Sequence, residues 1–280
     1  MTAHARSELI GARRIVVKVG SSSISGENSG KIAPIVEALA AAHARGTEVV
    51  LVSSGAIATG MPHLLLAERP SDLATQQAAA AVGQNVLIYR YQDALTPFKI
   101  VAGQVLLTAG DLENATHRSN ARRAMERLLG LRILPIVNEN DTVATHEIRF
   151  GDNDRLAALV AELIGADALI LLSDIECLYT RPPDQPGARP IDRVHYGDDL
   201  HGFEFGSVVV NSVGTGGAAT KVSAARLAAT SGVGVLVTSA DLVDDALTGA
   251  EIGTWFDPNP EPTAAAATGP LRTAGLVAPR

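Results

Sequence analysis

Cysteine and aromatic residues are scarce in this sequence. Its 280 residues include one cysteine, Cys177, so neither an intramolecular disulfide nor a cysteine-cluster metal site can form within the chain. Aromatic residues make up 4%, so the core must be built from Ala, Val, Leu and Ile. No apolar run reaches the roughly 18–20 residues that a membrane span needs, and the first residues carry no apolar run of signal-peptide length. These absences predict a soluble, cytoplasmic protein with no membrane partner.

An excess of positive charge is also missing. The formal net charge is −7 and the pI about 5.5, which argues against nucleic acid as the main partner. Hydrophobic residues make up 46% and the mean hydropathy is +0.17, so the chain can bury a sizeable core. The length allows one large domain or two small ones.

What the sequence does contain is an alternation of short apolar runs and longer Ala-rich helical stretches. The predicted strands are 14–19, 48–52, 100–107, 131–137, 168–172, 208–210 and 233–238. The predicted helices are 31–45, 71–94 (capped by Ser71 or Asp72), 115–129, 153–164, 217–231 and a last short one. Continuous apolar strands between helices predict a mostly parallel sheet covered on both faces. Three segments fall outside this pattern: 142–150 is compatible with a hairpin, 180–200 is expected to be irregular, and the end from about Pro258 is expected to be a flexible tail.

Ligands of an open parallel sheet bind beyond the carboxyl ends of its strands. Small, polar or acidic residues follow four of the predicted strands: Gly20 with serines 21–23, then Ser53, Ser54 and Gly55, then residues 138–141, then Ser173 and Asp174. Four such loops at one edge of a sheet indicate a ligand crevice.

The first of these loops is preceded by a lysine inside an apolar strand. In VVKVGSSS (16–23), Lys18 stands two residues before Gly20. A buried ammonium needs an anion nearby, and the glycine lets a ligand approach the backbone. The anion is either a bound phosphate or a carboxylate of the core, and the motif alone leaves both open.

A second lysine follows a glycine-rich loop. The segment GTGGAATK (214–221) leads into a helix with Lys221 near its start, where the helix dipole disfavours a cation unless an anion binds there. The loop is not a Walker A motif, and its plain alternative is a turn with a solvated lysine. It also matches GxGxxA at Gly214, Gly216 and Ala219, a weak dinucleotide fingerprint that leaves an oxidoreductase as an alternative.

Acidic and amide side chains cluster between residues 138 and 154. The members are Asn138, Glu139, Asn140, Asp141, Asp152, Asn153 and Asp154. Such a set suits recognition of an ammonium group, binding of a magnesium ion or orientation of lysines, and helix capping explains only part of it. The serine of VSSGAIATG (52–60) before Gly55 can offer its hydroxyl to a carboxylate. Two lysines, glycine-rich loops and an acidic cluster together favour phosphoryl transfer.

These segments together resemble the amino acid kinase family, and within it the branch that phosphorylates the side-chain carboxylate of L-glutamate. The resemblance is carried by VVKVGSSS, VSSGAIATG, LATQQAAAAVGQNVL, GQVLLT, PIVNENDTVATHEIRFGDND, LLSDIECLYT and GTGGAATKVSAARLA, in the family's order up to GTWFDP at 253–258. NENDTVAT with GDND is its most specific part.

The resemblance implies an α/β fold, a three-layer α/β/α sandwich on a mainly parallel sheet of about eight strands. The kinase domain would take up residues 1–258, with the amino acid site in 1–167 and the nucleotide site in 168–258. Residues 259–280 would be a flexible tail. Bacterial members often add a C-terminal PUA domain, to which nothing in this sequence corresponds.

The resemblance also implies roles for individual residues. Lys18 and Lys221 would be catalytic, with Asp154 orienting them, and Ser54, Asp141 and Asn153 would bind glutamate. The nucleotide site would comprise Lys18, Gly20, Ser173, Asp174, Thr215, Gly216, Gly217, Ala218, Ala219, Thr220 and Lys221. Magnesium would arrive through the phosphates of ATP, without protein ligands of its own.

The implied reaction is transfer of the γ-phosphoryl group of MgATP to L-glutamate, the first step of proline biosynthesis, with proline as feedback inhibitor and a homodimer or homotetramer as the assembly. Alternatives are a kinase of another small acid, a non-catalytic nucleotide-binding protein on this fold, and the oxidoreductase. The last leaves Lys221 unexplained, and its motif lies far from the opening strand–helix unit.

Overall fold

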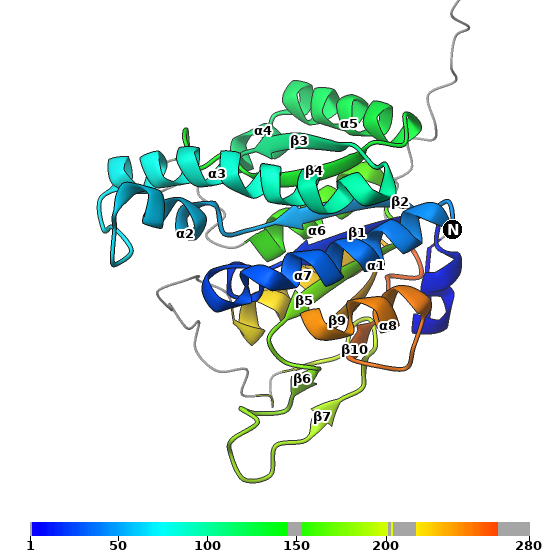
Figure 1. Ribbon diagram of the computed structural model, residues 1–280. Coiled ribbons are helices and arrows are strands. Elements are labelled where there is room, and N and C mark those ends of the chain that lie inside the picture. Colours follow the sequence, from blue (N-terminus) through cyan, green and yellow to red (C-terminus); the bar gives the residue numbers. More distant parts are fainter. Residues whose placement is uncertain (1, 145–152, 201–202, 204–216, 263–280) are drawn as a thin grey trace, which may run out of the picture.

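An eight-stranded sheet organises the residues that the computed structural model describes, which are 2–144, 153–200, 203 and 217–262 (Figure 1). In chain order its strands are β1 (Arg14–Val19), β2 (Glu48–Ser53), β3 (Ala102–Leu107), β4 (Leu134–Glu139), β5 (Ala168–Ser173), β8 (Arg193–Val194), β9 (Gly234–Ser239) and β10 (Thr254–Phe256). Their order across the sheet is β3-β4-β2-β1-β5-β9-β10-β8. All pairs are parallel except β9 with β10. The prediction of a mainly parallel sheet of about eight strands is confirmed.

Helices cover both faces of this sheet. On one face, α1 (Ile32–Ala44), α3 (Leu73–Leu95) and α8 (Val243–Thr248) share an apolar cluster with alternate strand residues such as Val17. On the other, α5 (Ala115–Gly130), α6 (Asn153–Ile164) and α7 (Ala218–Thr230) share a second cluster with the intervening residues such as Val16. This period-two division gives the predicted three-layer sandwich. Among the described residues, no helix is long and apolar enough to cross a membrane.

The helices and long strands match the expected segments closely, and Asp72 caps α3 by accepting a hydrogen bond from the Thr75 amide at 2.8 Å. The expectation that 180–200 is irregular is wrong in part. It contains β7 (Pro190–Ile191), which pairs with β6 (Leu178–Tyr179), and β8, which ends the main sheet. Two-residue strands are too short to show a hydrophobic period. The expected strand at 208–210 and most of the hairpin at 142–150 lie outside the described residues, as does the tail beyond Pro262.

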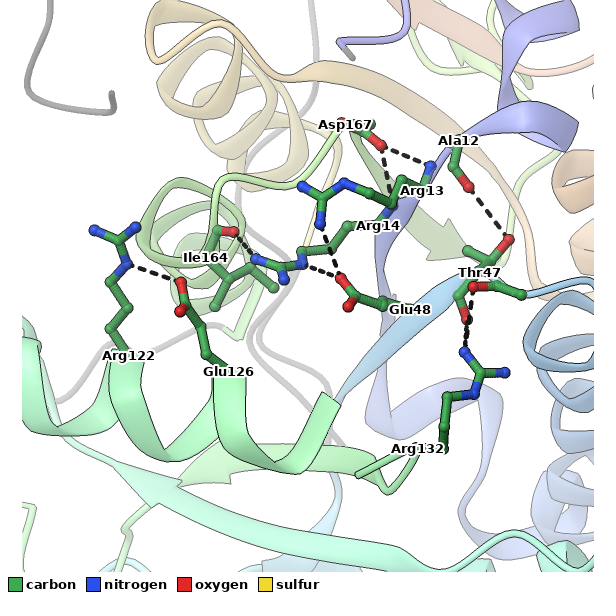
Figure 2. A network of polar contacts seen from close by, with 11 residues as sticks. Ala12, Arg13, Arg14, Thr47, Glu48, Arg122, Glu126, Arg132, Ile164 and Asp167 are labelled. Atoms are coloured by element: carbon green, nitrogen blue, oxygen red, sulfur yellow. Dashed lines mark hydrogen bonds and ion pairs between the residues drawn. The ribbon is translucent and has the colours of Figure 1, made fainter. Parts of the chain in front are cut away.

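A polar network fixes the amino ends of the central strands (Figure 2). Asp167 accepts hydrogen bonds from the main-chain amides of Arg13 and Arg14 at 2.7 and 3.0 Å. The Arg14 side chain in turn pairs with Glu48 at 2.7 Å and donates to the Ile164 carbonyl. The network therefore joins the starts of β1, β2 and β5, and this alignment brings their carboxyl ends to one common edge.

Two glycines let α2 (Ala56–Gly60) cross α3 at backbone contact. A Cβ atom at Gly83 would lie 1.8 Å from the Ala56 carbonyl oxygen and 2.5 Å from the Gly60 nitrogen. A Cβ at Gly60 would lie 1.9 Å from the Ala79 carbonyl oxygen. Because α2 begins directly after the loop that follows β2, this crossing also sets where that loop lies.

We expect Gly83→Ala to push the two helices apart. The added methyl meets main-chain atoms, which cannot rotate away, so the free energy of unfolding should fall by about 1–3 kcal/mol despite the better helix propensity of alanine. Chemical denaturation measures this. Gly130→Ala, at the end of α5 where a Cβ meets nothing within 4 Å, is the control and should change stability little. An unchanged midpoint for Gly83→Ala would contradict the crossing.

Candidate active site

The first residue of the site is a lysine near the carboxyl end of β1. Lys18 shares its face of β1 with Val16, and Val16 packs in the cluster that includes α6 and α7. Only 3% of the Lys18 side chain is exposed. A Cβ built on Gly20 would lie 3.8 Å from the Lys18 ammonium, so the backbone at Gly20 runs directly beside this cation.

Asp154 binds two lysines at once. As the second residue of α6 it is completely buried, and its carboxylate forms ion pairs with Lys18 through Oδ1 and with Lys221 through Oδ2, the latter at 3.3 Å. The Lys221 side chain is 9% exposed. Two buried cations thus share this one carboxylate. Two ammonium groups held close together in an interior favour an anionic ligand beside them.

The start of α7 adds amide donors to these cations. Gly217 precedes α7 in an extended conformation, and the Thr220 hydroxyl lies 3.1 Å from the Gly217 nitrogen and 3.2 Å from Asp154 Oδ2. No side chain of the described residues caps the amides of Ala218 and Ala219. The first amides of a 13-residue helix and its positive dipole end are suited to an anion such as phosphate.

A chain of amide hydrogen bonds lies beside the lysine pair. Asn153 Nδ2 donates to the Ser53 carbonyl at 2.6 Å and to Asn138 Oδ1 at 2.7 Å. Asn138 Oδ1 also accepts from the Glu139 amide at 2.9 Å, and Asn138 Nδ2 donates to Gln84 Oε1 at 2.6 Å. Asn153 comes from α6 and Gln84 from α3, so the chain links the helix layers of both faces across the ends of β2 and β4.

A second contact from α3 supports the same strand end. The Tyr91 hydroxyl lies 2.9 Å from Ser53 Oγ, and burial raises the Tyr91 pKa, so the phenol stays protonated. Neither Gln84 nor Tyr91 was predicted from the sequence as a site residue. The sequence did contain a sign of them. Both are polar residues on the inward stripe of α3, beside Leu87 and Leu95, where apolar residues are expected.

The other residues predicted for the site have fewer described contacts with Asp154 and Asn153. Ser54 follows β2, and its carbonyl accepts from Ser53 Oγ at 3.2 Å. Asp141 lies in the turn after β4. Ser173 ends β5 and donates to Asp174 Oδ1 at 3.1 Å. Thr215 and Gly216 lie outside the described residues.

Metal ligands are not gathered in the described ranges, where no group of three or more His, Cys, Asp or Glu side chains is placed to hold a metal ion. Two ammonium groups and the start of α7 are the positive charges of the described site named above.

Comparison with known proteins identifies the family of the chain. The model of the amino acid kinase family matches residues 13–239, a span that includes Lys18, Asp154 and Lys221. The chain belongs to the amino acid kinase family. A protein named glutamate 5-kinase from Clavibacter sepedonicus is 72% identical over 253 residues, which cover 90% of this chain and 97% of that protein. A protein of the same name from Leifsonia xyli subsp. xyli is 70% identical and covers 93% of this chain and 97% of its own length.

Solved structures of other members show the same fold at low identity. Carbamate kinase from Giardia lamblia bound to AMP-PNP superimposes with a TM-score of 0.66 at 16% identity, covering 89% of this chain and 100% of that one. An isopentenyl phosphate kinase superimposes with a TM-score of 0.58 at 21% identity, covering 87% of this chain and 99% of its own. The amino acid kinase fold is thereby established for this chain.

Proposed function

We propose that this member of the amino acid kinase family transfers the γ-phosphoryl group of MgATP to the side-chain carboxylate of L-glutamate, giving L-glutamyl 5-phosphate and ADP. The observation that carries the proposal is the buried Asp154 carboxylate shared by Lys18 and Lys221. The choice of glutamate is supported by the relatives at 70–72% identity that bear the name glutamate 5-kinase.

The two lysines address the main obstacle to this reaction. A carboxylate must approach a triphosphate, and both are anions. Two unit charges about 4 Å apart interact by roughly 4 kcal/mol at an effective dielectric near 20, so ammonium groups at that place offset much of the repulsion. The carboxylate oxygen forms a bond to phosphorus as the bond to the ADP oxygen breaks. The nucleophile is already ionised, so no general base is required.

The nucleotide would bind along the start of α7. Ala218, Ala219 and Thr220 would present amides to the phosphates, with Gly217 as the extended residue before them. Lys18, Gly20 and Lys221 would flank the phosphates. Ser173 and Asp174 would contact the nucleoside from β5, and Thr215 and Gly216 would complete the loop. Magnesium would be held by the phosphates and neutralise their charge.

Glutamate would bind at the amide chain. Both hydrogens of Asn153 Nδ2 are used by Ser53 and Asn138, so the side chain can offer a ligand only its Oδ1, a pure acceptor. An acceptor suits the α-ammonium group of an amino acid. Asp141 would supply a second acceptor for that group, and Ser54 a hydroxyl for the α-carboxylate.

The proposal extends to regulation and assembly by family resemblance. Proline would inhibit by overlapping the glutamate site, as expected for the first step of proline biosynthesis, and the chain would act as a homodimer or homotetramer. The amino acid site would lie in residues 1–167 and the nucleotide site in residues 168–258.

The proposed activity is tested by ADP release with MgATP and L-glutamate, with and without proline. Hydroxylamine trapping of the acyl phosphate, run in parallel with aspartate and N-acetylglutamate, identifies the acceptor. We expect trapped product with glutamate, at least tenfold less with the other acids, and a lower rate with proline. Product with another acid alone would replace glutamate as the substrate. ATP binding without ADP release would show a non-catalytic protein.

A further inference from the structure

We propose that Gln84 is a positioning residue for the amino acid substrate. It acts through Asn138, whose amide it holds in the one orientation that keeps Asn153 ready for glutamate. The inference rests on the proposed function, because it names the substrate that Asn153 receives. Gln84 is buried, with 8% of its surface exposed, and its Oε1 accepts from Asn138 Nδ2 at 2.6 Å.

The direction of every hydrogen bond in this chain is set by two main-chain groups. The Ser53 carbonyl can only accept, so Asn153 must turn its Nδ2 toward it. The Glu139 amide can only donate, so Asn138 must turn its Oδ1 toward that amide. This same Oδ1 accepts the second hydrogen of Asn153 Nδ2. Asn138 Nδ2 must therefore point away, and Gln84 Oε1 is the acceptor that meets it.

Loss of that acceptor would remove the partner of the buried Asn138 Nδ2 group. The unpaired N–H is costly in the interior, and rotation of the Asn138 side chain to find water or another acceptor would carry its Oδ1 away from Asn153. Asn153 would then lose one of the two contacts that fix its side chain. Its Oδ1 would no longer be held toward the substrate's ammonium group. The defect would fall on glutamate binding, and the Lys18–Asp154–Lys221 cluster would stay intact.

The rest of α3 supports this assignment. The inward stripe of α3 is apolar at Leu87 and Leu95 and polar at Gln84 and Tyr91. Both polar members reach strand residues that hold Asn153, since Tyr91 contacts Ser53 Oγ and Gln84 contacts Asn138. A glutamine that only stabilised the helix–sheet contact could bind any polar group of the sheet. Gln84 binds Asn138, the residue that aligns Asn153.

The experiment compares two substitutions that differ in the acceptor alone. Gln84→Met keeps the length and volume but removes the acceptor, and Gln84→Glu keeps an oxygen facing Asn138 Nδ2. Steady-state kinetics are measured for both substrates. We expect Gln84→Met to raise the KM for glutamate about tenfold, the size of effect of one lost buried hydrogen bond, with kcat and the KM for ATP within about twofold of wild type. Gln84→Glu should recover most of the glutamate KM.

Gln92→Met provides a matched control on the same helix. The Gln92 side chain makes two main-chain contacts, accepting from the Ala102 amide at 2.8 Å and donating to the Ile100 carbonyl at 3.1 Å. These contacts lead to the start of β3, away from the site. This substitution should lower the melting temperature as much as Gln84→Met does and leave the glutamate KM unchanged.

The outcomes distinguish failure of the inference from failure of the proposed function. An active wild type whose glutamate KM does not respond to Gln84→Met would overturn the inference and leave the function intact. A glutamate KM raised equally by Gln84→Glu and Gln84→Met, or equally by Gln92→Met, would also overturn it, because the effect would then be general loosening. A wild type with no activity on glutamate would overturn both.

Discussion

Asp154→Asn is expected to lower kcat by about a hundredfold or more without weakening ATP binding. The substitution keeps the shape of the side chain and removes its charge, so the buried ammonium groups of Lys18 and Lys221 lose their shared counter-ion. They would repel each other and leave the positions where they balance the transferred phosphoryl group. The loss of two charge-assisted contacts from the transition state accounts for about 3 kcal/mol, or two decades in rate.

Stability should respond to the same substitution in a way that ATP reverses. Removing one partner of a buried ion pair costs about 3–5 kcal/mol because it leaves uncompensated buried charge. The phosphates of ATP would supply that missing negative charge. We therefore expect a lower melting temperature for the free variant and a larger upward shift with ATP than wild type shows.

Glu162→Gln is the control for Asp154→Asn. Glu162 lies on the same helix and pairs with Arg118 at 2.7 Å on the partly exposed side. Its neutralisation should change neither kcat nor the response to ATP. A kcat for Asp154→Asn within threefold of wild type would contradict the role given to this carboxylate.

Lys221→Ala is expected to lower kcat by about 10²–10³ and to raise the KM for ATP by less than tenfold. Lys18 and the amides at the start of α7 remain to bind the triphosphate, so ground-state binding survives in part. The charge that develops between donor and acceptor during transfer loses one ammonium, for which up to about 4 kcal/mol is available at contact distance. Initial rates over a matrix of ATP and glutamate concentrations separate the two constants.

Arg226→Ala tests whether any lost cation on α7 has this effect. Arg226 lies more than a turn further along the same helix and donates to the Asp198 carbonyl, away from Asp154. It should leave both constants near wild type. A Lys221→Ala variant with near-normal kcat, or one whose whole defect lies in the KM for ATP, would show that Lys221 only binds the nucleotide.

The fold followed from the sequence where the hydrophobic pattern was long and continuous. Six of the eight strands have six residues each, and α1, α3, α5, α6 and α7 have 12 or more, so each is long enough for its apolar pattern to predict its type. The edge formed by β8 and β10 was missed because strands of two or three residues have no measurable period, and their pairing partners lie far away in the chain. The glycine crossing of α2 on α3 was equally hidden, since only packing shows which glycine has no room for a Cβ.

By itself the sequence determined the chemistry of the site: a lysine within β1, a lysine at the start of α7, and an acidic and amide cluster before and within α6. These residue types and their motifs sufficed to indicate phosphoryl transfer. The family resemblance implied that Asp154 orients both lysines, and the tertiary structure shows its two ion pairs. Only the tertiary structure decided that Gln84 completes the amide chain to Asn153. The reason is physical. A motif fixes what a side chain can do. The direction of a hydrogen bond or ion pair depends on which strand ends and helix starts meet at one edge of the sheet, through contacts between residues far apart in the chain, such as Lys18 with Asp154.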